Sequence, residues 1–273
     1  MNSYIQLMRP SVCVLSSLGM LIGIIIASSF LTIPLLPAIL AIIVAFIITG
    51  AGNVINDIFD IDIDKVNAPH RPLPSGDISK DVAMKFFLLL VAAGLILSFI
   101  VNLSFLLIAV INVIVLYVYS WKLKVMPLIG NIAVSWLASS TFIAAGFILS
   151  FSAPLAILIL AFISFFATFS REIIKDIEDV RGDMKKRART LPIVAGFRVS
   201  KILASAFMAI AVLSLSLPFM LSIFSLTYLI GAVPAAVLAL YALFNPPEKS
   251  QKYVKIAMYL VFLGFLLGSF ITF

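Results

Sequence analysis

Nine runs of about 20 mostly apolar residues follow one another along this chain of 273 residues. A helix needs about 20 apolar residues to cross the hydrocarbon core of a bilayer. Hydrophobic residues make up 63% of the chain and charged residues 11%, which leaves too little polar surface to cover a soluble globule. A transmembrane barrel is disfavoured, because its strands would alternate in polarity. The runs cover approximately residues 10–30, 34–52, 82–101, 104–121, 127–150, 154–174, 200–217, 223–244 and 254–273.

The charged residues are confined to a few places between these runs. With nine crossings, all of those places lie on one side of the membrane. Basic residues concentrate in cytoplasmic loops, so we predict a multi-pass cell-membrane protein whose N-terminus and charged segments are cytoplasmic. The same rule explains the net charge of +7 without a nucleic-acid partner. The charged places are Arg9, residues 57–85, Lys122 with Lys124, residues 171–201 and residues 248–255.

Two acidic segments share one spacing of four, three and four residues, with an offset of 119 residues between them. At 100° per residue, each set covers an arc of about 60° on a helix. We call them the first and the second acidic stripe. Asp62 points away from the first stripe, and Asn56 borders it. The first stripe consists of Asn53, Asp57, Asp60 and Asp64, and the second of Glu172, Asp176, Asp179 and Asp183.

The repeat continues beyond the stripes, because Arg71-Pro72-Leu73-Pro74 is echoed by Arg189-Thr190-Leu191-Pro192 at an offset of 118 residues. Internal repeats are common in membrane folds, and their sites lie at the repeat interface. We therefore predict an all-α, polytopic fold in one transmembrane domain over residues 1–273. It has two pseudo-repeats of four helices, about 10–121 and 127–244, a ninth helix at about 254–273, and a cytoplasmic-side active-site cap.

The stripes predict a site for a hard cation. Carboxylates on one helix face repel each other by about 1 kcal/mol per pair at 4 Å even in water, and a cation removes this repulsion. Oxygen ligands without thiolates or imidazoles suit Mg²⁺, which commonly leaves positions open for phosphate oxygens. We therefore expect an Mg²⁺–diphosphate site. The alternative is a pair of hydrophilic helix ends with solvated acids.

Three phrases around the stripes carry a family resemblance. Asn56-Asp57-x-x-Asp60-x-x-x-Asp64 is followed by an intact RPLPSG at residues 71–76, and Asp179-x-x-x-Asp183 is preceded by Asp176. In this order, the phrases resemble those of the UbiA superfamily of intramembrane prenyltransferases, and the resemblance covers nearly the whole chain. The phrase from Arg171 to Asp179 is most similar to the archaeal members that make digeranylgeranylglyceryl phosphate.

The resemblance implies electrophilic prenyl transfer that depends on Mg²⁺. Mg²⁺ would grip the diphosphate of a polyprenyl donor and stabilise the charge that grows as the allylic C–O bond breaks. The implied donor is geranylgeranyl diphosphate, and the implied lipid-like phosphate acceptor is geranylgeranylglyceryl phosphate, as in archaeal ether lipid biosynthesis. Asp60, Asp64, Asp179 and Asp183 would be catalytic. The implied metal ligands are Asn56, Asp57, Asp60, Asp64, Asp176, Asp179 and Asp183.

Further polar residues are candidates for substrate binding. Tyr119 and Lys124 best match a Tyr-to-Lys element of the family, and Lys122 or Lys124 could grip diphosphate; the alternative is an interfacial aromatic ring with snorkelling lysines. Arg71 could contact phosphate or fix its proline-rich turn. Arg189 is the best candidate of a basic cluster that could bind an anionic acceptor or touch anionic membrane lipids. The cluster is Arg181, Lys185, Lys186, Arg187 and Arg189, and Asn53 completes the substrate-binding candidates.

Two other functions remain open at this point. One keeps the enzyme class but changes the acceptor to an aromatic ring of the 4-hydroxybenzoate type, as in quinone biosynthesis. The other is a divalent-ion or lipid transporter with acidic gates. A transporter usually needs ionisable groups along its path, whereas the apolar runs of this chain are almost free of them.

Overall fold

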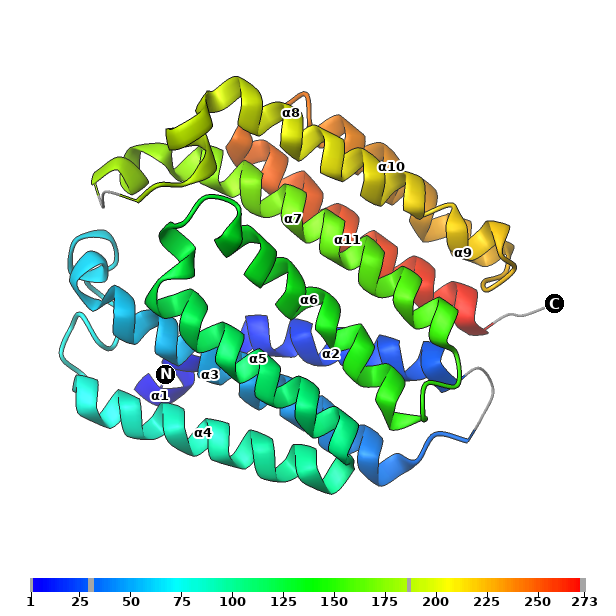
Figure 1. Ribbon diagram of the computed structural model, residues 1–273, viewed down its shortest axis with the longest axis horizontal. Helices are drawn as coiled ribbons and strands as arrows, with labels where there is room; N and C mark the ends of the chain where they lie inside the picture. The colour runs from blue at the N-terminus through cyan, green and yellow to red at the C-terminus, as the bar shows by residue number, and fades with distance from the viewer. Residues whose placement is uncertain (1, 29–31, 186–187, 271–273) are drawn as a thin grey trace.

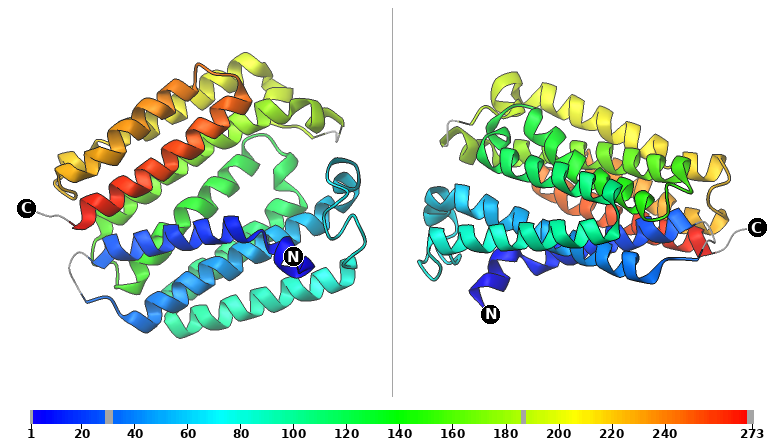
Figure 2. Two further views of the ribbon diagram at one scale, coloured as in Figure 1. Left: turned by 180° about the vertical axis from the view of Figure 1, so that it is seen from behind. Right: turned by 60° about the horizontal axis from the view of Figure 1, so that its bottom comes forward.

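The computed structural model describes residues 2–28, 32–185 and 188–270, and within them every regular element is a helix (Figure 1). Eight helices are long and apolar enough to cross a membrane, and a shorter apolar segment, Leu226–Ala242, accompanies them. The long helices run roughly along one direction in all views (Figure 2). The chain is therefore a polytopic helical membrane protein, which confirms the predicted fold class. The count of nine crossings stays a prediction.

Each predicted apolar run overlaps at least one helix. The helices are α1 (Ser3–Met8), α2 (Pro10–Ser28), α3 (Leu35–Asn67), α4 (Lys80–Val101), α5 (Leu103–Trp121), η1 (Leu123–Val125), α6 (Ile129–Ile148), α7 (Pro154–Lys185), α8 (Leu191–Ser214), α9 (Leu217–Met220), η2 (Leu226–Tyr228), α10 (Leu229–Ala242) and α11 (Pro247–Phe270).

Two helices, α3 and α7, continue well beyond their apolar runs. They have 33 and 32 residues, so each is about 50 Å long at 1.5 Å per residue. The hydrocarbon core of a bilayer is only about 30 Å thick. The last turns of both helices can therefore leave the apolar layer, and these turns carry the two acidic stripes.

Some helix boundaries differ from the ends of the apolar runs, because residues that favour turns interrupt the helices. The run at 223–244 is divided between η2 and α10, and α8 begins nine residues before its run, at Leu191. Gly196 interrupts α8 with a φ of 84°, a backbone conformation that glycine adopts without a steric penalty. Asn102 separates α4 from α5, and its side chain accepts a hydrogen bond from the Phe105 N–H at 2.8 Å.

The polar connections gather at one end of the bundle. Figure 1 shows α1, the α3–α4 loop, η1, the end of α7 and the α10–α11 turn at this end. The last turn of α11 lies at the opposite end (Figure 1). A buried cluster that includes Leu7, Val54, Ile58 and Leu73 fixes α1 and the proline-rich loop against α3. The charged segments are thereby held around the ends of α3 and α7.

The packing of α10 against α11 predicts a large stability effect at Gly231. A Cβ atom at Gly231 would lie 2.3 Å from the Leu260 carbonyl oxygen and 2.5 Å from the Gly264 Cα atom. Because both are backbone atoms, the two helices would have to separate. We expect Gly231→Ala to lower the thermal midpoint in detergent by at least about 5 °C. Gly182→Ala, which meets nothing within 4 Å, is the control, and an equal midpoint for both variants would contradict this packing.

Candidate active site

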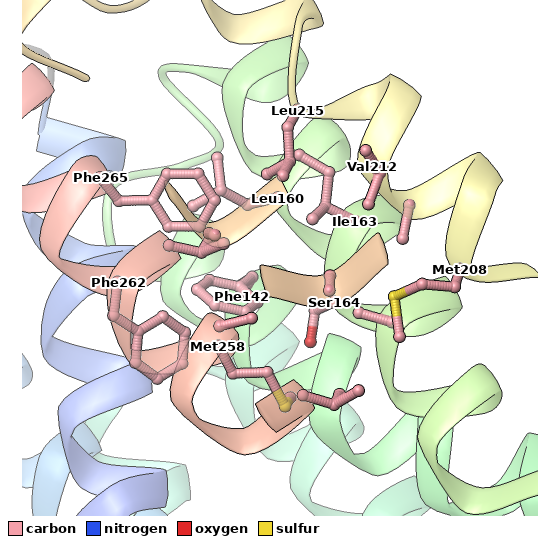
Figure 3. Close-up of a pocket in the computed structure, with 17 residues that line it drawn as sticks. Phe142, Leu160, Ile163, Ser164, Met208, Val212, Leu215, Met258, Phe262 and Phe265 are labelled. Atoms are coloured by element: carbon pink, nitrogen blue, oxygen red, sulfur yellow. The ribbon is translucent and has the colours of Figure 1, made fainter. Parts of the chain in front are cut away.

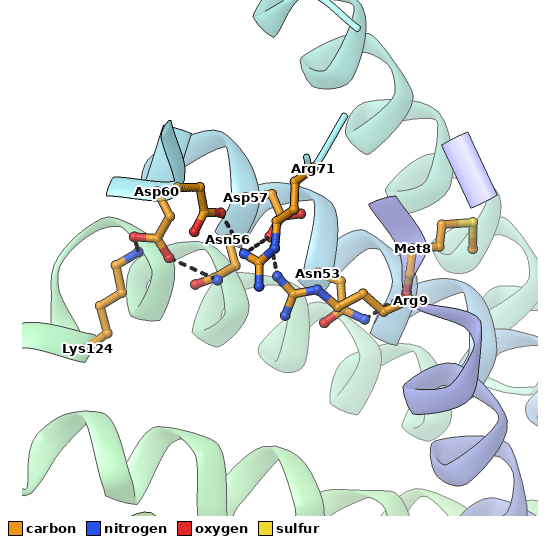
Figure 4. Close-up of polar contacts among 9 residues, drawn as sticks. Met8, Arg9, Asn53, Asn56, Asp57, Asp60, Arg71 and Lys124 are labelled. Carbon is orange, nitrogen blue, oxygen red and sulfur yellow. Dashed lines mark hydrogen bonds and ion pairs between the residues drawn. The ribbon is translucent and has the colours of Figure 1, made fainter. Parts of the chain in front are cut away.

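Each carboxylate of the first acidic stripe contacts a basic side chain (Figure 4). Arg9 forms an ion pair with Asp57. The Arg71 guanidinium lies 2.6 Å from an Asp64 carboxylate oxygen and 3.7 Å from Asp57, and the Lys124 ammonium lies 2.6 Å from Asp60. The Asp57 side chain is 3% exposed and that of Asp64 is 9% exposed. Three buried or half-buried acids are thus balanced by three basic residues from other segments.

The turn between α1 and α2 brings Arg9 to this stripe. Arg9 has a φ of 52°, and this reversal places the N-terminal segment against α3. The Asn53 side-chain amide donates a hydrogen bond to the Met8 carbonyl oxygen at 2.8 Å (Figure 4). The observed contact of Asn53 therefore holds the chain beside the site, whereas the sequence predicts that Asn53 binds substrate.

Arg71 reaches the stripe from the loop that follows α3. This loop is closed by backbone hydrogen bonds from Ser75 to Arg71 at 2.9 Å and from Ile78 to Pro72 at 3.1 Å. Leu73 is 4% exposed and anchors the loop in the apolar core. Asn56, beside the stripe, donates a hydrogen bond to Asp60 at 3.0 Å. The predicted site residues Asn56, Asp57, Asp60, Asp64 and Arg71 therefore lie together near the end of α3.

The described contacts of the second acidic stripe differ from those of the first. The Asn131 side chain donates a hydrogen bond to Asp176 at 2.8 Å, but an amide carries no charge. Among the side chains that the structure describes, which exclude those of residues 181 and 185–187, no lysine or arginine nitrogen lies within 4.0 Å of the Asp176 or Asp179 carboxylate. Glu172 has longer contacts, at 3.6 Å to Arg171 and 4.0 Å to Lys175. Asp179 is exposed and Asp183 half-buried.

Tyr119 lies near acids of both stripes. Its side chain interacts electrostatically with Asp60 of the first stripe and with Glu172, Asp176 and Asp183 of the second. Lys124 is 18% exposed in its pair with Asp60, whereas Lys122 is exposed. Of the two lysines that the sequence leaves open, the structure therefore brings Lys124 to the site. Tyr117 packs instead against Phe59, with ring centroids 5.7 Å apart.

The first turn of α6 connects the two stripes, and sequence reasoning missed it. A Cβ atom at Gly130 would lie 2.8 Å from the Leu123 carbonyl oxygen, so glycine lets α6 approach the η1 segment that carries Lys124. The next residue, Asn131, holds Asp176 and is 5% exposed. An amide near the start of an otherwise apolar run, at the end where the charges gather, is the signal that could have identified Asn131.

The α7–α8 connection returns the chain to η1. The Arg189 backbone N–H donates a hydrogen bond to the Val125 carbonyl oxygen at 2.9 Å, and the Arg189 side chain is exposed. Lys186 and Arg187 of the predicted basic cluster lie outside the described residues, as do the side chains of Arg181 and Lys185. The roles of the basic cluster therefore stay predictions.

Asn131 provides a test of how the second stripe is held. Asn131→Leu removes the hydrogen-bond donor of Asp176 at similar volume, so the carboxylate loses its orientation. We expect the Mg²⁺ concentration for half-maximal activity to rise about tenfold, with a smaller change in kcat at saturating metal. Asn112→Leu is the matched control, because Asn112 bonds Trp136 and Ser140 at 3.0 Å and no acid of either stripe. If the Mg²⁺ concentration for half-maximal activity rose equally in both variants, the effect would be a general one on packing.

The residues of both stripes fit Mg²⁺ in ligand chemistry. All candidate donors are carboxylate or amide oxygens, which this ion prefers. Among the described residues, no group of three His, Cys, Asp or Glu side chains is arranged so that it could hold a metal ion by itself. Mg²⁺ in phosphate-binding sites is usually held by one or two carboxylates together with phosphate oxygens, so an open arrangement suits it. Arg9, Arg71 and Lys124 meanwhile balance the first stripe.

Fold and site together define a multi-pass membrane protein with a polar, oxygen-rich site at one end of its helical bundle. The sequence matches the UbiA prenyltransferase family over residues 16–268, and the chain belongs to this family. A digeranylgeranylglyceryl phosphate synthase of Methanococcus aeolicus is 41% identical, over 97% of this chain and 97% of its own. The chain is thus a UbiA-family prenyltransferase.

Two solved structures share the fold. One, described as giving structural and mechanistic insights into the biosynthesis of digeranylgeranylglyceryl phosphate synthase in membranes, has a TM-score of 0.85 and 38% identity, and the match covers 98% of both chains. The other is a UbiA homolog from Archaeoglobus fulgidus bound to GPP and Mg²⁺, with a TM-score of 0.67 over 98% of this chain and 100% of its own. At 20% identity, the second likeness concerns the fold alone.

Proposed function

We propose that this prenyltransferase transfers a geranylgeranyl group from geranylgeranyl diphosphate to geranylgeranylglyceryl phosphate. The observation that carries the proposal is that η1 and the adjacent start of α6 link the two stripes: Lys124 pairs with Asp60 at 2.6 Å, and Asn131 donates a hydrogen bond to Asp176 at 2.8 Å. Arg9 and Arg71 add basic groups to the first stripe. Such a site can hold a diphosphate through metal ions and basic groups at the end of an apolar bundle. The names of the relatives support this choice of substrates.

The acidic stripes and the basic residues would each contribute to binding the donor diphosphate. Bound Mg²⁺ would neutralise the diphosphate and stabilise the charge on the leaving group. The ligands would be Asn56, Asp57, Asp60, Asp64, Asp176, Asp179 and Asp183, with Asp60, Asp64, Asp179 and Asp183 the most direct. With metal bound by these acids, Arg71 and Lys124 would be free to donate charge-assisted hydrogen bonds to phosphate oxygens.

Tyr119 and the apolar helices would orient the reacting carbon. Tyr119 lies near the acids of both stripes, and its electron-rich ring would stabilise an allylic cation next to the diphosphate. The apolar prenyl chain gains about 0.8 kcal/mol per CH₂ buried away from water and would extend between the helices. Arg189 would bind the phosphate of the acceptor from the α7–α8 connection.

The same proposal places the site at the cytoplasmic face of the cell membrane. The polar connections of the described chain lie at the end of the bundle that carries the stripes (Figure 1), and basic loops favour the cytoplasm. The two predicted pseudo-repeats would then contribute one stripe each.

The acceptor is tested directly by product analysis. Purified protein is incubated with geranylgeranyl diphosphate, Mg²⁺ and, in separate reactions, geranylgeranylglyceryl phosphate or 4-hydroxybenzoate, and the products are identified by mass spectrometry. We expect the ether product only with the glyceryl phosphate and only with Mg²⁺. Ring prenylation without ether formation would select the aromatic acceptor, and the absence of diphosphate release with either acceptor would reject both assignments.

A further inference from the structure

Three basic side chains from separate segments converge on the first acidic stripe. Arg9 lies in the turn after α1, Arg71 in the loop after α3, and Lys124 in η1. Each makes its closest ion pair with a different carboxylate of the stripe, and Figure 4 shows all three directed at the same part of α3. We call Arg9, Arg71 and Lys124 the basic trio. Its positive charges equal in number the carboxylates of the stripe.

These ion pairs are shielded from water, unlike a surface pair on the same helix. The Asp57 and Asp64 side chains are buried, and the side chains of Asp60 and of the basic trio are half-buried. The pair of Lys65 with Asp62 also belongs to α3, but both of its side chains are exposed. A buried charge is unfavourable unless an opposite charge accompanies it. The first stripe therefore requires the basic trio whenever no metal ion neutralises it.

The contacts of Asp60 occupy both of its carboxylate oxygens. The Lys124 ammonium lies 2.6 Å from Oδ1, and the Asn56 amide donates a hydrogen bond to Oδ2 at 3.0 Å. In the neighbouring pair, the Arg71 guanidinium lies 2.6 Å from Oδ2 of Asp64. A metal ion cannot take an oxygen lone pair that accepts a charge-assisted hydrogen bond until the donor moves away. Metal binding to the first stripe therefore competes with the basic trio.

The charges of the first stripe and the basic trio cancel each other, and this balance decides what can bind. Because three carboxylates already face three basic groups, one divalent ion added alone would leave two excess positive charges in a half-buried site. A prenyl diphosphate carries about three negative charges at neutral pH, and alone it would add to the charge of the acids. Added together, metal and diphosphate leave an excess of only about one charge. Each therefore favours the binding of the other.

We propose that the basic trio makes the first stripe select a divalent ion in complex with a diphosphate over the free ion. This selection rests on the proposed function, because the donor diphosphate has to bind beside the stripe. Without diphosphate, the basic trio keeps the carboxylates from the metal. When metal and diphosphate enter together, the basic trio donates its hydrogen bonds to phosphate oxygens and the carboxylates bind the metal. Arg9, Arg71 and Lys124 are thus specificity-determining residues of the donor site.

The selection is tested by electron paramagnetic resonance of Mn²⁺ bound to the full chain in neutral detergent, with and without inorganic pyrophosphate. Without pyrophosphate, Lys124→Met should raise the Mn²⁺ affinity of the first stripe at least about tenfold, because the competing charge is removed. In the same variant, the factor by which pyrophosphate increases Mn²⁺ affinity should fall at least about tenfold. Mn²⁺ and pyrophosphate also associate in solution, but to the same extent with every variant.

The bound Mn²⁺ has to be assigned to the first stripe. Adding Asp60→Asn to Lys124→Met should abolish the gain in affinity, since Asp60 is the acid that Lys124 contacts. The apolar pocket between α7, α8, α10 and α11 does not compete for the ion, because Ser164 is the only polar side chain among the described residues that line it (Figure 3). A gain that persists in the double variant would place the ion elsewhere and overturn the proposal.

Two further variants separate the selection from other causes. Lys65→Met removes the charge of the exposed pair with Asp62, and it should change the Mn²⁺ affinity by less than about twofold. Arg71→Gln should raise the affinity as Lys124→Met does, so the result does not depend on the folding of one variant. Unchanged or weaker Mn²⁺ binding in both Arg71→Gln and Lys124→Met would overturn the proposal, as would an equal gain in Lys65→Met.

The product analysis with geranylgeranyl diphosphate tests the proposed function independently. Normal ether formation by the unaltered chain, together with unchanged Mn²⁺ affinity in Arg71→Gln and Lys124→Met, would overturn the selection alone. Ring prenylation in place of ether formation, together with the expected changes in Mn²⁺ affinity, would correct the acceptor and support the selection.

Discussion

Asp60→Ala and Asp179→Ala are each expected to lower prenyl transfer by about a thousandfold, whereas Asp62→Ala should leave it within about threefold. Asp60 and Asp179 belong to stripes on two different helices, α3 and α7, and each would supply a metal ligand to the same diphosphate. The comparison requires initial rates with geranylgeranyl diphosphate and geranylgeranylglyceryl phosphate at saturating Mg²⁺.

Asp62 is the matched control for this experiment, because it lies on α3 only two residues from Asp60. Its side chain is 86% exposed and contacts Lys65 at 3.0 Å, away from the first stripe. A change in total charge near the site would affect Asp60→Ala and Asp62→Ala alike. Equal losses in all three variants would therefore contradict the assignment of the stripes as metal-binding faces.

Lys124→Met should have the second largest effect, a decrease in kcat/KM for the donor of about a hundredfold. Lys124 is half-buried against Asp60 at 2.6 Å, and a charge-assisted hydrogen bond to phosphate is worth about 1.5–3 kcal/mol. The loss should appear mainly as a higher KM for the prenyl diphosphate. Steady-state kinetics with varied donor concentration separates this effect from a change in kcat.

Lys122→Met is the control for Lys124, because it removes the same charge two residues away from an exposed side chain. We expect its kcat/KM to stay within about threefold. Lys124→Arg should recover part of the loss, since it keeps the charge but changes the donor geometry. A larger loss of kcat/KM in Lys122→Met than in Lys124→Met would contradict the assignment of Lys124 as the lysine that binds the diphosphate.

Local sequence information predicted the helices and the location of the stripes. The apolar runs identify the membrane segments because hydrocarbon permits only helices with saturated backbone hydrogen bonds. The four-three-four spacing placed acids on one face of two helices, and Figure 4 shows Asp57 and Asp60 on the same part of α3. The apolar runs did not reveal that α3 and α7 continue unbroken to Asn67 and Lys185, because polar helical turns have no hydropathy signal.

The partners of the acids were harder to predict, since they come from distant parts of the chain. Arg9 reaches Asp57 only because the backbone reverses after α1. Asn131 bonds Asp176 across 45 residues, and no periodic pattern connects them. Asn53 lies on the predicted stripe, yet its amide is used by the Met8 carbonyl. Spacing along a helix defines a face, but which neighbour meets that face depends on helix packing.

The central claim is that acids from both α3 and α7 hold divalent metal together with the donor diphosphate. It is tested most directly by anomalous diffraction from crystals of this protein grown with Mn²⁺ and geranylgeranyl thiolodiphosphate, a donor analogue that reacts slowly. We expect manganese peaks between the two helices, with oxygen ligands from Asp60 or Asp64 on one side and from Asp176, Asp179 or Asp183 on the other. Peaks bound by one helix alone, or a diphosphate held away from both stripes, would contradict the account.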